Sequence, residues 1–181
     1  MNIKQTASQT VGPFFHNALI RDGENNLVNQ HTRGERIWLR GTVFDGEGQV
    51  IPDAILEIWQ ADASGIYKHP TDPKHNQADP HFTSFGRAGT DKNGAYWFYT
   101  ILPSARTTTP YINLRLFMRG LLIHLVTRIY FADHPSDPVL NSLEPSRKFS
   151  LIATREDNPD GLTYRFDIHM QGELETVFFD V

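Results

Sequence analysis

Cysteine is absent from this chain of 181 residues. Its absence excludes disulfide bridges, thiolate metal sites and cysteine nucleophiles together. Any metal site would therefore have to use His, Tyr, Asp or Glu side chains. A chain without cysteine is also compatible with a reducing compartment.

Long apolar runs and an excess of basic residues are missing as well. No run approaches the roughly 20 residues that a membrane-spanning helix needs, and residues 1–6 lack the apolar core of a signal peptide. The 17 Lys and Arg residues are outnumbered by 21 Asp and Glu residues, which gives a formal net charge of −4. A phosphate backbone therefore finds no obvious counter-charge, and we expect a cytoplasmic protein that binds neither nucleic acid nor membranes.

Familiar catalytic motifs are also lacking. The eight histidines include no His-x-x-x-His pair on a plausible helix and no His-x-His pair on a strand. No Gly-x-Ser-x-Gly elbow is present, and no glycine-rich loop precedes a helix. His69, His75 and His81 recur in a polar segment, but this spacing in a loop fixes no geometry, so solvated side chains are expected. From the residues alone, the chain shows no catalytic centre of its own.

Short β-type runs separated by turn residues make up most of the chain. Asp45-Gly46-Glu47-Gly48 and Asp91-Lys92-Asn93-Gly94 offer turn chemistry, because glycine tolerates positive φ and aspartate bonds to nearby backbone. Alternating or aromatic-rich runs predict seven strands at 37–44, 54–60, 95–100, 111–119, 125–131, 149–155 and 162–168. The predicted fold is all-β, a prealbumin-like β-sandwich of two antiparallel or mixed sheets with long loops.

The segments outside these runs complete the expected organisation. Gly12-Pro13 lies at the centre of residues 8–15 and predicts an extended N-terminal arm. Residues 68–87 contain three prolines and predict a long surface excursion. A short helix is expected near 136–142, and the apolar tail within 172–181 is expected to pack against the rest of the chain. We therefore predict an arm and loop at 1–36 and a single sandwich domain at 37–181.

The segment from Glu57 to Tyr67 carries more specific information than the strand pattern does. Its text, Trp59-Gln60-Ala61-Asp62-Ala63-Ser64-Gly65-Ile66-Tyr67, closely resembles the W-Q-A-[DN]-x-x-G-x-Y signature of the intradiol ring-cleaving dioxygenases. In that family two tyrosinates and two histidines hold a ferric ion, a hard metal suited to phenolate oxygen. The resemblance places Tyr67 where the first tyrosinate would be.

The other three ligand positions of the family are altered in this chain. The resemblance aligns Arg106 with the second tyrosinate, and Tyr111 and Asn113 with the two histidines. A fixed positive charge at Arg106 disfavours a ferric ion by direct repulsion. We therefore expect no metal on this chain, with Tyr67, Arg106, Tyr111 and Asn113 as degenerate ligand positions.

Over nearly its whole length the chain resembles the iron-free α-type subunits of two-chain family members. This resemblance implies a β-type partner subunit that binds Fe(III), in an assembly of multiple α/β pairs. The assembled enzyme is expected to cleave protocatechuate with O₂ to 3-carboxy-cis,cis-muconate in aromatic catabolism, with this chain inactive when alone. The resemblance further implies that Thr10, Gly12, Pro13, Phe14 and Arg119 contribute to the partner's substrate pocket.

Two alternatives remain open at this point. The strand and turn text alone fits a prealbumin-like binding or structural module without any role in ring cleavage. A self-sufficient dioxygenase with an unusual metal set, drawn from Tyr67, Tyr111 and the loop histidines, is the other.

Overall fold

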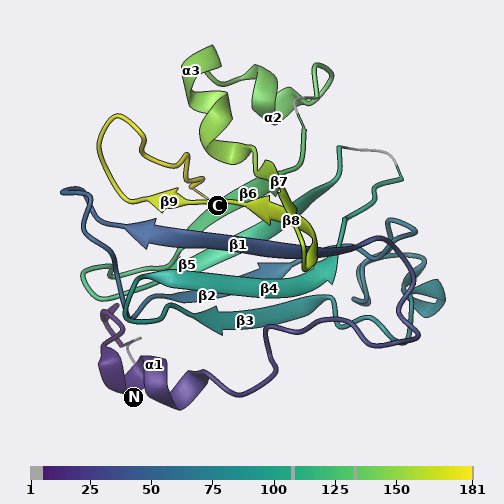
Figure 1. The fold of residues 1–181 in the computed structure, drawn as a ribbon, viewed down its shortest axis with the longest axis horizontal. Coiled ribbons are helices and arrows are strands. Elements are labelled where there is room, and N and C mark those ends of the chain that lie inside the picture. Colours follow the sequence, from purple (N-terminus) through teal and green to yellow (C-terminus); the bar gives the residue numbers. More distant parts are fainter. Residues whose placement is uncertain (1–5, 107–108, 133, 181) are drawn as a thin grey trace, which may run out of the picture.

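The strands form two facing sheets in a computed structural model (Figure 1) that describes residues 6–106, 109–132 and 134–180. Residues 1–5 of the predicted arm and Val181 of the predicted tail lie outside this part. Within it, one sheet has the order β4 (Ala95–Ile101), β1 (Arg36–Phe44), β8 (Gly161–Arg165) and β7 (Thr154–Asn158), with β9 (Ile168–His169) also beside β1. The other has the order β3 (Phe85–Gly89), β2 (Ile55–Trp59), β5 (Tyr111–Phe117) and β6 (Leu125–Tyr130). The predicted all-β fold of two sheets is confirmed, and the first sheet is mixed because β8 and β9 run parallel to β1.

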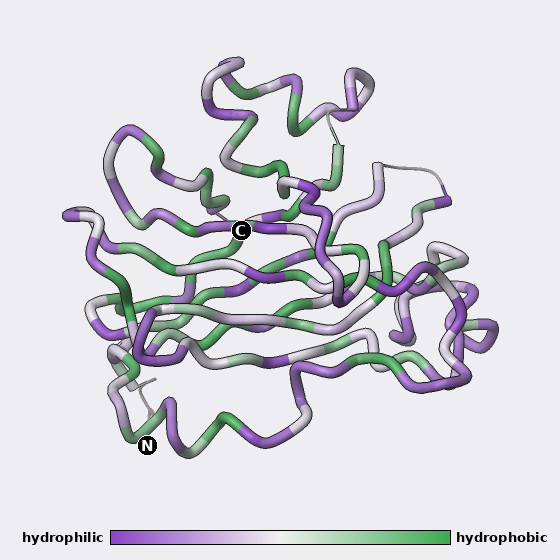
Figure 2. Tube along the Cα trace, in the orientation of Figure 1, coloured by the Kyte–Doolittle hydropathy of each residue, from purple (hydrophilic) through white to green (hydrophobic). Residues whose placement is uncertain are grey.

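Strict alternation along the strands creates the core between the sheets. In β1 the side chains of Ile37, Leu39 and Val43 are fully buried, whereas Trp38, Arg40 and Thr42 are partly exposed. The same period of two appears in β4 and β5, as expected for strands with one face on a core and one face outward. Figure 2 shows the hydrophilic colour gathered in the connecting segments and hydrophobic residues interspersed along the strands.

One turn geometry recurs three times in the chain, at Asp45, Asp62 and Asp91. In each case the aspartate Oδ1 accepts hydrogen bonds from the backbone N–H groups two and four residues later, at 2.8–3.0 Å. The third residue after each aspartate is a glycine with positive φ, +77° at Gly48, +71° at Gly65 and +71° at Gly94. This conformation is unfavourable for residues with a Cβ atom. The turns predicted from Asp45 and Asp91 are thus confirmed.

The N-terminal arm departs from the prediction at Pro13. Residues 6–12 carry neither helix nor strand and Gly12 is extended, but α1 (Pro13–Leu19) follows directly. The extended arm is therefore wrong from Pro13 onward. Proline was taken to exclude a helix. At the first helical position, however, the backbone N–H of any residue lacks an intrahelical partner, so proline loses no hydrogen bond there.

Two further predictions need correction in their boundaries. Residues 149–155 were expected as a strand, but Phe149–Leu151 form the 3-10 helix η2 and β7 begins only at Thr154. Strand β3 was missed because it lies at the end of the proline-rich segment 68–87 and contains two glycines. That segment also contains the 3-10 helix η1 (His75–Gln77).

Short helices and the C-terminal tail build a second, smaller core. Two short helices, α2 (Pro138–Asn141) and α3 (Pro145–Lys148), lie on the opposite side of the sheets from α1 (Figure 1). The helix expected near 136–142 is confirmed by α2. Leu140 packs there with Tyr130 and Leu151, and Val177 and Phe179 of the tail cover them. The tail therefore packs as predicted from Glu175 to Phe179, whereas Leu174 is exposed. Among the described residues, no helix has the length and apolar character that crossing a membrane requires.

Candidate functional site

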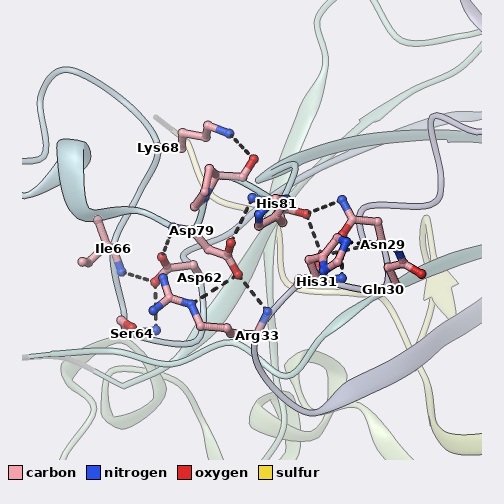
Figure 3. Close-up of polar contacts among 12 residues, drawn as sticks. Asn29, Gln30, His31, Arg33, Asp62, Ser64, Ile66, Lys68, Asp79 and His81 are labelled. Carbon is pink, nitrogen blue, oxygen red and sulfur yellow. Dashed lines mark hydrogen bonds and ion pairs between the residues drawn. The ribbon is translucent and has the colours of Figure 1, made fainter.

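Two buried carboxylates fix the loop that carries Tyr67, as Figure 3 shows. The Asp62 Oδ1 atom accepts from the backbone N–H groups of Ser64 and Ile66, and its Oδ2 atom accepts from the N–H of Asp79 at 2.8 Å. Asp62 is 2% exposed. One side chain of the family signature thus joins its own turn to the distant segment 68–87.

Asp79 continues this network toward the N-terminal half of the chain. Its carboxylate accepts from the backbone N–H groups of Arg33 and His81 at 2.8 and 2.9 Å, and the Arg33 Nε atom lies 3.6 Å away. Burial acts to raise the pKa of Asp79, but these donors and the Arg33 guanidinium lower it below its ordinary value. Segment 68–87 is therefore anchored at Asp79 and at the buried Phe82, rather than lying wholly on the surface as predicted.

All four degenerate ligand positions line one cavity of about 970 Å³. Tyr111 and Asn113 project from the same, outward face of β5, because side chains two residues apart share a face of a sheet. Tyr67 and Arg106 reach the cavity from loops. The structure thus brings together the residues that the sequence resemblance placed around a lost metal.

Protein groups hold the Nε and Nη2 atoms of Arg106 at this site. Its Nη2 atom lies 3.0 and 2.8 Å from the two carboxylate oxygens of Asp72, and its Nε atom donates to the Gly65 carbonyl at 3.0 Å. Asp72 also accepts from the backbone N–H groups of Tyr67 and Lys74, and these bonds, with the Arg106 pair, hold its pKa below the ordinary value. The guanidinium therefore links the turn before Tyr67 to the loop after it.

This donor set does not fit a ferric ion. It offers two phenols, one amide and a cation, and the nearby carboxylate of Asp72 is already paired with Arg106. Burial raises the pKa of Tyr67 to about 12, with further increases from Tyr111 and Asp72 that outweigh the opposing effect of Arg128. The phenol is thus held in its neutral form. Nor do the described residues contain a group of three or more His, Cys, Asp or Glu side chains that could hold a metal.

The Tyr67 shift predicts a late tyrosinate in an alkaline titration. We expect the ultraviolet absorbance step that is lost in Tyr67→Phe to lie near pH 12 rather than near the ordinary 10.0. Because the unfolded chain releases this proton first, the contribution of Tyr67 to folding stability falls as the pH rises from about 10 to 12. A difference titration of wild type against Tyr67→Phe measures the step. A midpoint at or below 10 would contradict the prediction.

Thr10, one of the residues expected at the partner's pocket, lies on the surface beside the β5–β6 connection. The Thr10 Oγ1 atom accepts from the Gly120 N–H at 2.8 Å and donates to the Met118 carbonyl at 3.4 Å. Thr10 is thereby held beside Arg119. Phe14, from the same predicted set, projects from α1 with 90% of its surface exposed, and Gly12 is the residue immediately before that helix.

Arg119 has a partner that the sequence did not reveal. Its Nε and Nη2 atoms both lie 2.6 Å from the Oδ2 atom of Asp53, whose side chain is 10% exposed. The Asp53 Oδ1 atom is buried and makes no hydrogen bond. In the sequence Asp53 only follows a proline in a turn, so it gave no sign of pairing with a residue 66 positions away.

Known proteins match this chain over almost its full length. The family model described as Dioxygenase matches residues 10–172. The protocatechuate 3,4-dioxygenase alpha chain of Burkholderia cepacia is 40% identical to it, over 99% of this chain and 98% of the relative. The beta chain named for the same enzyme in the same organism is 34% identical, over 93% and 77%.

A solved structure supports the fold independently. The dioxygenase domain of a dioxygenase carbohydrate-binding protein fusion from Streptomyces sp. SirexAA-E has a TM-score of 0.60 and 23% identity, over 84% of this chain and 88% of that domain. At this identity the likeness concerns the fold alone. The family match and the full-length relatives together show that this chain belongs to the intradiol dioxygenase family and is homologous to its protocatechuate 3,4-dioxygenase α chains.

Proposed function

We propose that this chain is the iron-free α-type subunit of an enzyme that cleaves protocatechuate with O₂, and that a β-type subunit holds the ferric ion. The observation that carries the proposal is the replaced donor set, in which the Arg106 guanidinium is paired with Asp72 among the former ligand positions. Similarity to both an alpha and a beta chain of one named enzyme supports an α/β assembly. The bound Fe(III) of the partner supplies the activation of the catechol, and this chain supplies shape and charge at the pocket.

Exposed apolar side chains support a large contact with the partner. Phe14 and Phe15 on α1 and Leu122 and Ile123 in the β5–β6 connection are all at least half exposed. A groove of about 490 Å³ separates residues of the arm from that connection. Clustered exposed apolar surface of this kind marks protein interaction sites, and it lies next to Thr10 and Arg119.

The residues of this chain then have separable roles in the shared pocket. Gly12 permits close approach of backbone, and Pro13 starts α1 and so fixes the direction of Phe14. Arg119 offers a guanidinium to the carboxylate of the substrate.

We also propose that residues 1–36 act as an arm and loop on a single domain at 37–181.

Reconstitution with a β-type chain tests the proposal. Iron content, visible absorption and protocatechuate-dependent oxygen uptake are measured for this chain alone, the β-type chain alone and the co-expressed pair. We expect a coloured, iron-bearing and active pair beside an iron-free and inactive α-type chain. Iron and turnover in this chain alone would overturn the proposal in favour of a self-sufficient dioxygenase. An inactive pair with an iron-loaded partner would favour a structural module instead.

A further inference from the structure

The cavity lined by the degenerate ligand positions also has a floor with a regular arrangement of side chains. Its floor is the outward face of the four-stranded sheet, where Phe85, Trp59, Asn113 and Arg128 are direct cross-strand neighbours on β3, β2, β5 and β6. Adjacent strands lie about 4.8 Å apart, so Trp59 and Arg128 are about 10 Å apart across the floor. The row therefore presents an aromatic surface at one end, an amide in the middle and a guanidinium at the other end.

Arg128 is held in place but not neutralised. Its guanidinium carbon lies 4.3 Å from the centroid of the Tyr111 ring and 5.6 Å from that of Phe179. Its one hydrogen bond with a described residue is from Nη1 to the Tyr130 hydroxyl, at 3.3 Å. That hydroxyl in turn donates to Asp137 at 3.4 Å. The half-buried cation thus touches a neutral oxygen, and the Asp137 carboxylate stabilises its charge from beyond ion-pair distance.

The formal charges of the cavity lining balance, because Glu57, Asp72 and Asp180 stand against Arg106, Arg115 and Arg128. Glu57 is paired with Arg87 at 2.7 Å, and Asp72 is paired with Arg106. The remaining charged residues in the lining are Arg115, Arg128 and, in the exposed tail, Asp180, and His69 is the histidine of the lining. Arg128 forms no ion pair with a described residue, so its guanidinium remains available to an anionic ligand.

Aromatic walls define the shape of that ligand. Trp59 stacks on Tyr67 with a centroid distance of 6.1 Å, and Phe85 and Phe179 also line the cavity. Planar apolar surfaces of this kind favour a ring, because stacked aromatic groups gain both burial and favourable geometry. The cavity is also large enough for such a ligand, at about 970 Å³.

We propose that this cavity is a non-catalytic binding site for an aromatic carboxylate, in which Arg128 contacts the carboxylate and Trp59 lies against the ring. The cavity adjoins the groove beside the β5–β6 connection, because Val126, Phe179 and Asp180 line both. This binding goes beyond the proposed function, because an iron-free cavity binds such a molecule without cleaving it.

Counting bound ligand tests the inference. Equilibrium dialysis with 4-hydroxybenzoate is expected to give two sites per co-purified α/β pair, one at the partner's iron and one on this chain. Arg128→Met removes the carboxylate contact, and we expect its affinity at the second site to fall by about 30-fold. Arg40→Met is the matched control, because Arg40 lies over Trp38 at 4.7 Å on the other sheet, away from the cavity. We expect this control to keep both sites.

The possible outcomes separate this inference from the proposed function. A single site in the wild-type pair, or two unchanged sites in Arg128→Met, overturns it even if the pair is fully active. If no active pair forms, dialysis of this chain alone still gives one site in wild type and none in Arg128→Met. Should Arg128→Met lower the Tm, Arg128→Lys keeps the charge but loses the planar fork, and we expect about 10-fold weaker binding. Unchanged affinity in that variant would also overturn the inference.

Discussion

Replacing Arg119 with methionine in the assembled α/β enzyme is expected to lower kcat/KM for protocatechuate by about 30-fold. A hydrogen bond from a charged donor contributes roughly 2 kcal/mol, and each 1.4 kcal/mol corresponds to about a factor of ten. Asp53 already occupies the Nε and Nη2 atoms of Arg119, but 59% of the arginine side chain stays exposed. The unoccupied part of the guanidinium is therefore free to bind the carboxylate of the substrate.

Catechol, which lacks the carboxylate, separates recognition from structural damage. We expect Arg119→Met to change kcat/KM for catechol little, whereas an equal loss with both substrates would assign Arg119 a purely structural role. Removal of Arg119 alone also leaves the buried carboxylate of Asp53 unpaired, which destabilises the fold. The double variant Asp53→Asn/Arg119→Met removes both charges, so it should recover the lost Tm without recovering the activity toward protocatechuate.

Replacing Asp62 with alanine is expected to destabilise the chain by about 4 kcal/mol. Three backbone N–H groups, those of Ser64, Ile66 and Asp79, lose their acceptor. The last two are buried, and each unsatisfied buried donor costs roughly 1–3 kcal/mol. The loss also detaches segment 68–87 from the loop that carries Tyr67. Chemical denaturation of the purified chain or pair measures the change.

Asp91 provides a matched control with the same turn geometry. Its Oδ1 atom accepts from Asn93 and Ala95 at 2.8 and 3.0 Å, but the residue is exposed and water can replace it. We expect Asp91→Ala to cost about 1 kcal/mol, because the solvated donors are not left unpaired. Asp62→Asn should lie between the two, since its amide presents a donor to the Asp79 N–H. Equal losses in Asp62→Ala and Asp91→Ala would show that burial of the Asp62 network adds nothing.

The fold was predictable wherever one periodicity dominated. The alternation in Ile37 to Val43 places every second side chain on one face, and the sandwich follows from several such runs. Strand β3, Phe-Gly-Arg-Ala-Gly, is short and contains two glycines, so it owes its conformation to pairing with β2 rather than to local preference. The prediction at Pro13 was wrong because proline has two opposite effects. It disfavours a helix in the residues before it, but it favours a helix that begins at the proline itself.

The candidate site was predictable in its composition but not in its contacts. Family resemblance placed Tyr67, Arg106, Tyr111 and Asn113 together, and all four line the cavity. The partners of the charged residues could not be foreseen, because Asp53 and Asp72 are ordinary turn residues in the sequence. Long-range pairs such as Arg119 with Asp53 depend on how the sheets bring distant turns together.

The threefold recurrence of the aspartate–glycine turn bears on how such proteins are recognised. The aspartate and glycine of the Trp59-to-Tyr67 signature perform the same backbone task as their counterparts at Asp45 and Asp91, where no metal position is involved. The conformation of the loop therefore favours an aspartate and a glycine at these positions whether or not the loop also carries a metal ligand. The aspartate and glycine of such a signature thus indicate the conformation of the loop. Whether a metal can bind is indicated by other positions, such as Arg106. A chain that is itself iron-free, as we propose for this one, can thus keep the aspartate and glycine of the signature.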